Sequence, residues 1–194
     1  MTTPTIKTVT AAEAEPTVAT LVLAFSADPP ARWIYPDPSQ YLIHYPNFVK
    51  AFGGQAFAHQ SAYYLEGYAG AALWFPPEVH PDEEAVMALV QRTVAAPVLP
   101  DILAVLEQMS RYHPSEPHWY LSLLGVDPLH QNQGYGSALL RHALISCDRD
   151  HTPAYLESSN PRNIPLYERH GFELLGVIQV GTSPPIFPML RRPR

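Results

Sequence analysis

The stretch LGVDPLHQNQGYGSALL, residues 124–140, joins the end of an apolar, strand-like run to the start of a helix-like run. Gly134 and Gly136 stand at the junction between the two runs. Glycine lets a backbone come close to a ligand, and the free N–H groups and the dipole of a helix N-terminus favour an anionic phosphate. This context predicts a loop that binds a phosphorylated ligand, with a plain tight turn as the alternative interpretation.

Two better-known phosphate-binding loops do not fit these residues. A P-loop requires Lys followed by Ser or Thr after its glycines, and no such pair follows here. The dinucleotide-binding fingerprint requires a third glycine, and Leu139 stands where that glycine would fall. The loop therefore indicates another class of phosphorylated ligand.

Strand-like and helix-like patterns alternate along the rest of the chain. Alternating and β-branched runs predict strands at residues 5–9, 118–126, 154–158, 172–180 and 186–191, and a hairpin within residues 55–75. Apolar residues at helical spacing predict helices at residues 11–27, 39–52, 82–95, 100–112, 135–148 and 163–170. Residues 28–38 contain four prolines, which predict an irregular loop before a helix capped by Ser39. The alternation favours a mixed α/β sheet in one domain.

The composition excludes several classes of protein. Hydrophobic residues make up 46 % of the chain and charged residues 15 %, which predicts a packed core and argues against disorder. The net charge of -6, with only 12 Lys and Arg, disfavours nucleic acid as a partner. The single cysteine, Cys147, cannot form an internal disulfide, and no Cys/His spacing predicts a metal site. Because no apolar run is long enough to span a membrane and residues 1–14 lack signal-peptide features, we expect a cytoplasmic protein without membrane contact.

The segments around the glycine loop resemble the GNAT superfamily of N-acetyltransferases. Gln131, Gly134 and Gly136 match the family's acetyl-CoA-binding pattern, Q/R-x-x-G-x-G/A after a strand that ends in valine and a proline-containing turn. Downstream, YLESSNPRNIPLYERHGF (residues 155–172) is similar to the family's strand, Asn-containing loop, helix and Tyr-x-x-x-Gly-Phe ending. The likeness is strong from about residue 116 onward and thin before it. Within the superfamily it is greatest to the puromycin N-acetyltransferase group.

The resemblance implies the GNAT fold, a mixed and mostly antiparallel central sheet of about seven strands with a splay between the two middle strands and helices on both faces. It implies one domain over residues 1–194, with the acceptor side at about 1–115 and the acetyl-CoA-binding part at about 116–194. The implied reaction is direct transfer of acetyl from acetyl-CoA, the co-substrate, to the amine of a small molecule such as an antibiotic or another xenobiotic. An acyl-CoA-binding sensor without turnover and a peptide N-acetyltransferase are the alternatives. Homodimers are common in the superfamily, so the oligomeric state is left open.

The resemblance also implies roles for single residues in cofactor binding. Tyr167 matches the tyrosine that the family places near the cofactor sulfur as a general acid. Asn163 matches a position that often contacts the pantetheine arm, with a helix N-cap as the alternative. Gly125 is expected to permit a bulge where the arm pairs with the strand edge. The implied cofactor contacts are Leu124, Gly125, Val126, Gln131, Asn132, Gln133, Gly134, Tyr135, Gly136, Ser137, Asn163 and Tyr167.

The general base stays open at this point. Glu157 ends a strand that is predicted to border the splay, so its carboxylate is a candidate base, with an ion pair to Arg162 as the alternative. Some family members place a glutamate base on the strand before the glycine loop. The aligned position here is Tyr120, which is no ordinary base near neutral pH.

Aromatic residues of the first half are candidates for contacting the acceptor. Trp33 and Tyr35 lie in the predicted proline-rich loop, and Trp74 lies on a predicted strand. Aromatic walls suit a flat or apolar amine. We therefore expect these three residues to contact the substrate.

Residues of the strand before the glycine loop complete the predicted substrate site. Ser122 and His118 are expected to share a strand face with Tyr120 and Leu124, because side chains two apart on a strand point the same way. Tyr120 and Ser122 are therefore expected to contact the acceptor. The other histidines, His113 among them, receive no role.

Overall fold

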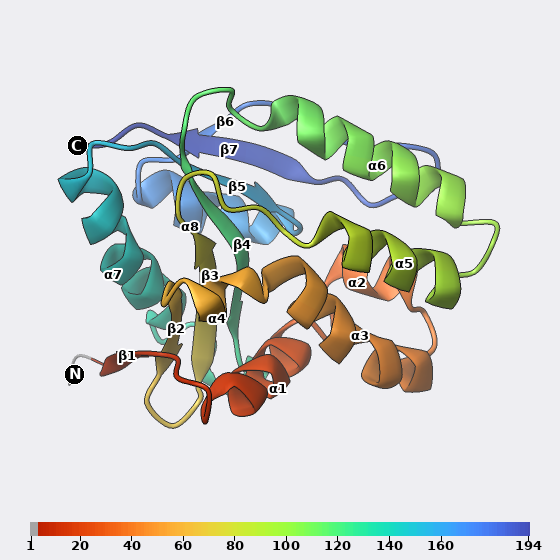
Figure 1. Ribbon diagram of the computed structural model, residues 1–194, viewed down its shortest axis with the longest axis horizontal. Coiled ribbons are helices and arrows are strands. Elements are labelled where there is room, and N and C mark those ends of the chain that lie inside the picture. Colours follow the sequence, from red (N-terminus) through yellow and green to blue (C-terminus); the bar gives the residue numbers. More distant parts are fainter. Residues whose placement is uncertain (1–3) are drawn as a thin grey trace.

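A seven-stranded sheet runs through residues 4–194, which are the residues that the structure, a computed structural model, describes. The strands are β1 (Ile6–Thr8), β2 (Ala62–Leu65), β3 (Gly70–Phe75), β4 (Trp119–Val126), β5 (Ala154–Ser158), β6 (Glu173–Leu174) and β7 (Phe187–Arg191). They lie in the order β1-β2-β3-β4-β5-β7-β6, and only the central pair, β4 and β5, is parallel. The expected mixed, mostly antiparallel sheet is confirmed (Figure 1).

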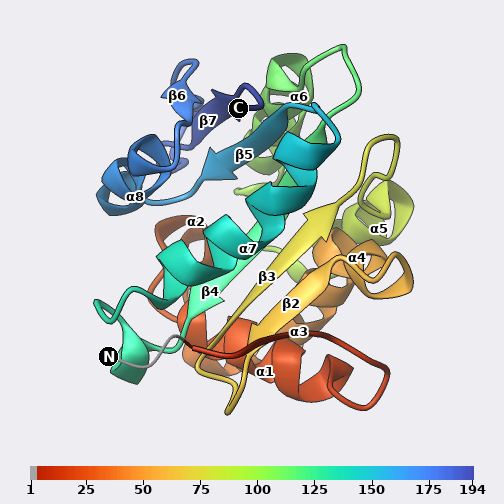
Figure 2. The same ribbon diagram turned by 90° about the vertical axis from the view of Figure 1, so that its left-hand side faces the viewer.

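Helices cover both faces of this sheet (Figure 2). They are α1 (Ala14–Ala24), α2 (Pro29–Ile34), α3 (Pro38–Gly53), α4 (Gln55–Ala58), α5 (Glu83–Thr93), α6 (Leu99–Tyr112), α7 (Tyr135–Arg149) and α8 (Ile164–Arg169), with single 3₁₀ turns at η1 (Pro128–His130) and η2 (Pro161–Asn163). On one face α1 and α3 bury Leu21 and Tyr45 with Leu73, and on the other α7 buries Leu140 with Trp74. Among residues 4–194, no helix has both the length and the apolar character needed to cross a membrane.

The proline-rich segment, residues 28–38, is more regular than the sequence predicted. It contains α2, because prolines at the first helical positions need no N–H partner and the Asp28 side chain caps the helix by accepting from Ala31 N at 3.2 Å. The next helix is capped by Asp37, whose Oδ1 accepts a hydrogen bond at 2.9 Å, and Ser39 lies inside that helix. Trp33 therefore lies on α2, where the sequence predicted a loop.

Two further segments differ from the predicted elements. The short α4 occupies the start of the predicted hairpin, which is formed by β2 and β3. The predicted strand 172–180 pairs only over β6 and again through an isolated bridge between Ile178 and Ile186. Gly176 lies inside this predicted strand, and glycine in a strand interior weakens the pairing.

The two middle strands separate beyond their first three residue pairs, which is the splay expected from the resemblance. The parallel pairing of β4 with β5 runs from Trp119, opposite Ala154, to Leu121, opposite Leu156, and then stops. The remainder of β4 continues to pair with β3 on its other side. Its edge toward β5 therefore has unpaired backbone groups from Ser122 onward.

The bulge in β4 lies at Ser122, and the prediction that Gly125 forms it is wrong. The β3 register jumps there, since Leu121 and Leu123 face consecutive residues of β3. The extra residue reverses the side-chain alternation, so Leu124 packs with the α7 face and does not share the face of Tyr120.

Gly125 instead allows a close approach of α1 to the sheet. It pairs regularly with Ala71 of β3. A Cβ atom at this position would lie 2.5 Å from the Ala24 Cβ atom, well inside van der Waals contact. The glycine is therefore required by packing.

Candidate active site

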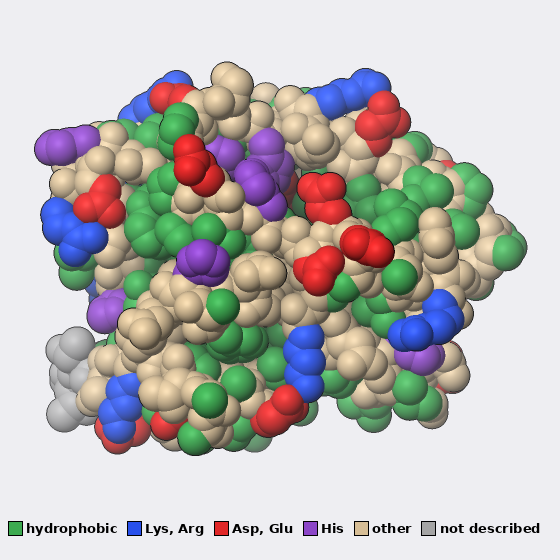
Figure 3. All heavy atoms as spheres, viewed as in Figure 1, with side chains coloured by type: hydrophobic (Ala, Val, Ile, Leu, Met, Phe, Trp, Pro, Cys, Tyr) green, Lys and Arg blue, Asp and Glu red, His purple; other side chains and the backbone are tan. Residues whose placement is uncertain are grey.

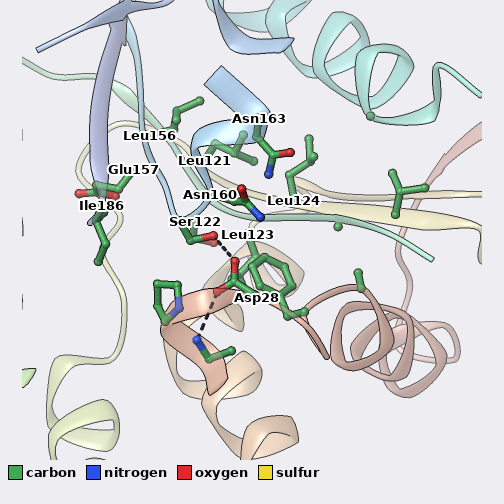
Figure 4. A pocket seen from close by; sticks show the side chains of 18 of the residues that line it. Asp28, Leu121, Ser122, Leu123, Leu124, Leu156, Glu157, Asn160, Asn163 and Ile186 are labelled. Atoms are coloured by element: carbon green, nitrogen blue, oxygen red, sulfur yellow. Dashed lines mark hydrogen bonds between the residues drawn. The ribbon is translucent and has the colours of Figure 1, made fainter. Parts of the chain in front are cut away.

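A cavity of about 710 Å³ opens where β4 and β5 separate. Its floor is formed by β4. One half is lined by the loop before α7, by η2 and by α8, and we call it the cofactor half after the sequence prediction. The other half is lined by α2, α3, α5 and α6, and we call it the acceptor half. Figure 4 shows Asn160 and Asn163 near Leu124, and Glu157 beside Ile186. The cavity thus joins the two halves of the chain.

The glycine loop fits the pyrophosphate and pantetheine of a coenzyme A thioester. Gly134 has a φ of 81° at the N-cap of α7, and no atom lies within 4 Å of the position that a Cβ would take. Asn132 also has a positive φ, 60°. Because first-turn N–H groups have no partner inside their helix, the loop presents donors and open space to an anion. The free edge of β4 offers hydrogen-bonding groups to an extended arm on the same side.

Most residues that the resemblance implied for cofactor binding line this cavity. They are Leu124, Gly125, Val126, Gln131, Asn132, Gly134, Tyr135, Gly136, Ser137, Asn163 and Tyr167. Gln133 is exposed and is not among the lining residues. The Ser137 hydroxyl contacts His170 Nε2 at 2.7 Å and accepts from Arg141 at 2.8 Å, so its backbone N–H is the group left for a phosphate.

Asn163 precedes α8 but does not cap it with its side chain. The side-chain cap in this region comes from Asn160, whose Oδ1 accepts from Arg162 N at 3.0 Å. Both asparagines line the cavity, as Figure 4 shows. The amide of Asn163 therefore remains available to a ligand.

Tyr167 reaches the cavity from α8 and is 6 % exposed. Burial, together with the nearby negative charge of Asp28, raises the pKa of its phenol well above the usual range. The hydroxyl is therefore protonated at neutral pH and can donate a hydrogen bond or a proton. Its ring packs edge-on against Phe172, which holds it in place.

Glu157 lies at the opposite side of the cavity and its side chain is 3 % exposed. Its Oε1 is 3.2 Å from His113 Nε2, so the carboxylate pairs with this histidine and does not form the ion pair with Arg162 that was the alternative interpretation. Burial and the charge of Glu157 raise the pKa values of the Tyr120 and Tyr155 phenols. His113 comes from the end of α6, outside the segments that resemble the family, and no sequence signal pointed to it.

Asp28 is a second, partly buried carboxylate in the cavity, and the sequence analysis missed it. It accepts hydrogen bonds from Ala31 N and from the Ser159 hydroxyl (Figure 4), and burial raises its pKa. An Asp placed directly before two prolines is a common N-cap pattern, which is the signal that could have located it. Nothing in the sequence indicated that this cap would face the site.

The residues predicted to contact the substrate divide into two groups. Trp33, Tyr120 and Ser122 line the cavity. Tyr35 is buried beneath it with its hydroxyl 2.8 Å from Thr93 Oγ1. Trp74 is fully buried on the α7 face, because β3 points it away from the acceptor side. Tyr35 and Trp74 therefore do not contact the cavity.

The acceptor half of the cavity has largely apolar walls. They are formed by Trp33, Ile34, Phe48, Phe52, Val86, Val90, Ile102, Val105, Leu106, Met109 and Ile186. The two cationic arginines of the cavity, Arg162 and Arg169, belong to η2 and α8 in the cofactor half. Asp28 and Glu157 are thus the acidic groups that an acceptor would meet.

The loop between β6 and β7 is tied to two of these walls. Thr182 donates to Asp101 Oδ2 of α6 from its backbone N at 2.9 Å and from its hydroxyl at 3.0 Å. Its hydroxyl also accepts from Trp33 Nε1 of α2 at 3.1 Å. These bonds connect α2 and α6 across the acceptor side and give it the form of a pocket.

Comparison with known proteins agrees with this arrangement. The sequence model of the acetyltransferase (GNAT) family matches residues 32–172. An uncharacterized N-acetyltransferase of Schizosaccharomyces pombe is 43 % identical over 54 residues, which are 28 % of this chain and 22 % of that protein. The chain thus matches about a fifth of the length of that relative.

Two solved structures resemble the whole chain. One is described as histone acetyltransferase HPA2 and related acetyltransferase from Corynebacterium glutamicum, with a TM-score of 0.72, 27 % identity, and coverage of 100 % of this chain and 98 % of that one. The other is arylalkylamine N-acetyltransferase 2 from Aedes aegypti, with a TM-score of 0.69, 10 % identity and full coverage of both chains, which is a likeness of fold. The family match extends over more than half of the chain, so the chain belongs to the GNAT family of acetyltransferases and is an acyltransferase.

Proposed function

We propose that this chain transfers the acetyl group of acetyl-CoA to the amine of a small molecule with an apolar body. The observation that carries the proposal is a pair of carboxylates, the buried Glu157 and the partly buried Asp28, in the apolar acceptor half of a cavity whose other half fits coenzyme A. Buried carboxylates are costly unless a cation or a proton compensates them, so they favour an ammonium group. The apolar walls favour the rest of such a molecule.

The donor would be held by the chain's own backbone. The N–H groups at the start of α7 would bind the pyrophosphate, the free edge of β4 would pair with the arm, and Asn163 would contact it from η2. When bound, acetyl-CoA supplies an acetyl thioester and a thiol leaving group. Acetyl-CoA is the general donor of the family, which supports this assignment.

Proton transfers would be divided between the two sides of the cavity. Each turnover removes two protons from the acceptor ammonium, gives one to the leaving thiol and releases one. Glu157, directly or through a water, accepts the proton that the ammonium must lose before it becomes a nucleophile. The Tyr167 hydroxyl donates to the leaving sulfur and regains its proton from the acylated nitrogen. Asp28, held by Ser159 and Ala31, positions the ammonium by charge.

The class of amine is supported by the pocket and by names of similar proteins. The walls contain Phe48, Phe52 and Trp33, which suit an amine with an aromatic or aliphatic body. An arylalkylamine N-acetyltransferase has the same fold. The resemblance of residues 116–172 to the puromycin N-acetyltransferases adds puromycin to the acceptors that should be tested.

A peptide acceptor is the second candidate, because the similar Corynebacterium glutamicum structure carries a histone acetyltransferase description. The bonds from Thr182 to α2 and α6 argue against it, since they narrow the space through which an extended chain would enter. A ligand-binding role without turnover would leave Tyr167 and Glu157 unused. We therefore place both alternatives behind small-molecule acetylation.

The test is thiol release from acetyl-CoA across a panel of phenethylamine, tryptamine, puromycin, agmatine and a peptide with a free N-terminus. We expect turnover on an apolar amine, a higher KM with Asp28→Asn, a lower kcat with Glu157→Gln, and unchanged values with the exposed control Glu66→Gln. Acetylation of the peptide alone, read by mass spectrometry, would favour the peptide function. Binding of acetyl-CoA without turnover on any acceptor would contradict the enzyme proposal for this panel.

A further inference from the structure

Two histidines outside the cavity connect Glu157 to the surface. Glu157 Oε1 is 3.2 Å from His113 Nε2, His113 Nδ1 is 3.3 Å from His118 Nε2, and His118 Nδ1 is 2.9 Å from the backbone oxygen of Glu116. The side chain of Glu157 is buried, whereas that of His113 is 26 % exposed and His118 is also partly exposed. Figure 3 shows histidine side chains gathered at the surface near the middle of the face viewed there.

The hydrogen-bonding rules of these groups fix where the protons lie. A carbonyl oxygen only accepts, so His118 Nδ1 carries a proton and the neutral ring has its lone pair on Nε2. That lone pair accepts from His113 Nδ1, which leaves His113 Nε2 without a proton in the neutral ring. Two acceptor atoms, His113 Nε2 and Glu157 Oε1, then face each other at 3.2 Å. One further proton is needed between them.

Glu157 Oε1 is buried and receives no hydrogen bond of good geometry among the residues described. His113 is therefore the ionisable partner that the structure places against this oxygen. A proton shared by the pair compensates the buried carboxylate, and its position can change when a further proton arrives. The arrangement accepts protons at the cavity end and can release them at the surface end.

We propose that Glu157, His113 and His118 form a relay that carries the proton lost by the acceptor ammonium from the cavity to water. The relay rests on the proposed acetyl transfer. The relay starts from the proton that Glu157 and His113 share. The ammonium nitrogen gives its proton to Glu157, and the shared proton settles on His113 Nε2. His113 then gives its Nδ1 proton to His118 Nε2, and His118 releases one proton to water. Reorientation of the rings or exchange with water restores the starting tautomers. His113 and His118 do not touch the acceptor, so they act through Glu157.

The surroundings of His118 favour proton movement from Glu157 outward to the surface. Burial, with the nearby charges of His113 and His80, lowers the pKa of His118, although its bond to Glu116 and the charge of Glu157 oppose this shift. A lowered pKa favours proton release at the outer end of the chain.

Two tyrosines that pack on the His113 ring do not compete for the proton. The ring centroids of Tyr120 and Tyr155 lie 4.8 and 4.5 Å from that of His113. Burial and the charge of Glu157 raise the pKa values of both phenols, so they stay protonated. The proton path therefore runs through imidazole nitrogens.

The first test is chemical rescue in the full chain. We expect His113→Ala to lower kcat by about 10²-fold with an unchanged KM, because a positioned proton-transfer group contributes at least that factor. Imidazole added to the buffer should restore kcat in a concentration-dependent way, whereas a purely structural loss would not respond. His118→Ala should give a smaller loss with the same rescue, and the exposed His59→Ala should match the wild type. A kcat of His113→Ala within twofold of the wild type, or a loss without rescue, would overturn the relay.

The second test needs no turnover and so separates the relay from the proposed function. Ring ¹⁵N–¹H correlation spectra of the wild type report which nitrogen of each histidine carries the proton. We expect the Nδ1–H tautomer for the neutral rings of both His113 and His118. An Nε2–H tautomer at either ring would contradict the proton order above. If no acceptor is turned over but both rings show Nδ1–H, the acetylation proposal fails while the proton order of the relay is supported.

Discussion

Replacing Tyr167 with Phe should abolish most of the turnover and leave the stability of the protein unchanged. The change removes one hydroxyl that faces the cavity and keeps the ring packed against Phe172. Loss of a positioned general acid lowers kcat by about 10²- to 10⁴-fold, which corresponds to roughly 3–5 kcal/mol of activation free energy. Because no core packing is lost, we expect the free energy of unfolding to change by less than about 0.5 kcal/mol and Tm by less than about 2 °C.

Tyr41→Phe is the matched control, because it removes the same atom at a site without a proposed chemical role. The Tyr41 hydroxyl donates to Val22 O at 2.6 Å, and both groups are buried. Leaving that carbonyl unsatisfied should cost about 1–3 kcal/mol, or a Tm lower by roughly 2–10 °C, with kcat unchanged at temperatures where the variant is folded.

The assays are thiol release from acetyl-CoA with a turned-over amine and thermal unfolding followed by circular dichroism. Full turnover in Tyr167→Phe would refute the acid role. A Tyr167→Phe variant that loses turnover and also unfolds as early as Tyr41→Phe would show that the tyrosine acts through packing. The acid role of Tyr167 requires opposite effects of the two substitutions. Tyr167→Phe should lose turnover and keep its Tm, and Tyr41→Phe should keep its kcat and lose Tm.

Three further predictions concern stability and reactivity. Gly125→Ala should lower Tm by roughly 2–10 °C, because the added Cβ would lie 2.5 Å from the Ala24 Cβ and overpacking costs about 1–3 kcal/mol. An unchanged Tm would mean that α1 moves freely. Arg191→Met should cost about 1–3 kcal/mol in urea unfolding, because it removes the two 2.8 Å hydrogen bonds that Arg191 gives to the partly exposed Asp148 and the one it gives to His170 O. The hydrogen bonds from Arg191 hold the pKa of Asp148 below its usual range. The stability that they supply is therefore fully present above about pH 4 and is lost as the pH falls through the folded-state pKa. Asp148→Asn should flatten this acid dependence of the urea midpoint. Burial raises the pKa of Cys147 to about 12, so a thiol reagent at pH 8 should label it only after unfolding, and rapid labelling of the native protein would contradict its burial.

The cofactor half of the site could be predicted from the sequence because its chemistry is local. Gly134 and Gly136, with the helix that follows, form the predicted phosphate-binding loop within a few residues, and backbone N–H groups would do the binding there. The splay between β4 and β5 followed from the same resemblance and is confirmed. The candidate roles of Asn163 and Tyr167 followed from the resemblance of residues 155–172 to the family.

The acceptor half could not be predicted in the same way, because packing between distant segments decides it. Asp28, His113 and Glu157 are far apart in sequence. Only the meeting of α2, the end of α6 and β5 brings Asp28 and Glu157 to one cavity and places His113 against Glu157. A single extra residue at Ser122 reverses which face of the sheet the later side chains of β4 occupy, a register effect that periodicity alone does not reveal.

Trp74 shows the limit of the sequence most clearly. Residue type and strand position made it a reasonable substrate contact, but β3 is covered on both faces, so hydrophobicity does not tell one face from the other. The sequence by itself determined the fold family and the loop for the donor, since these depend on backbone conformation and neighbouring residues. The tertiary structure alone decided which acids and aromatics line the acceptor half of the cavity and which histidines lie behind Glu157, because side-chain direction is set by the packing of the whole sheet and its helices.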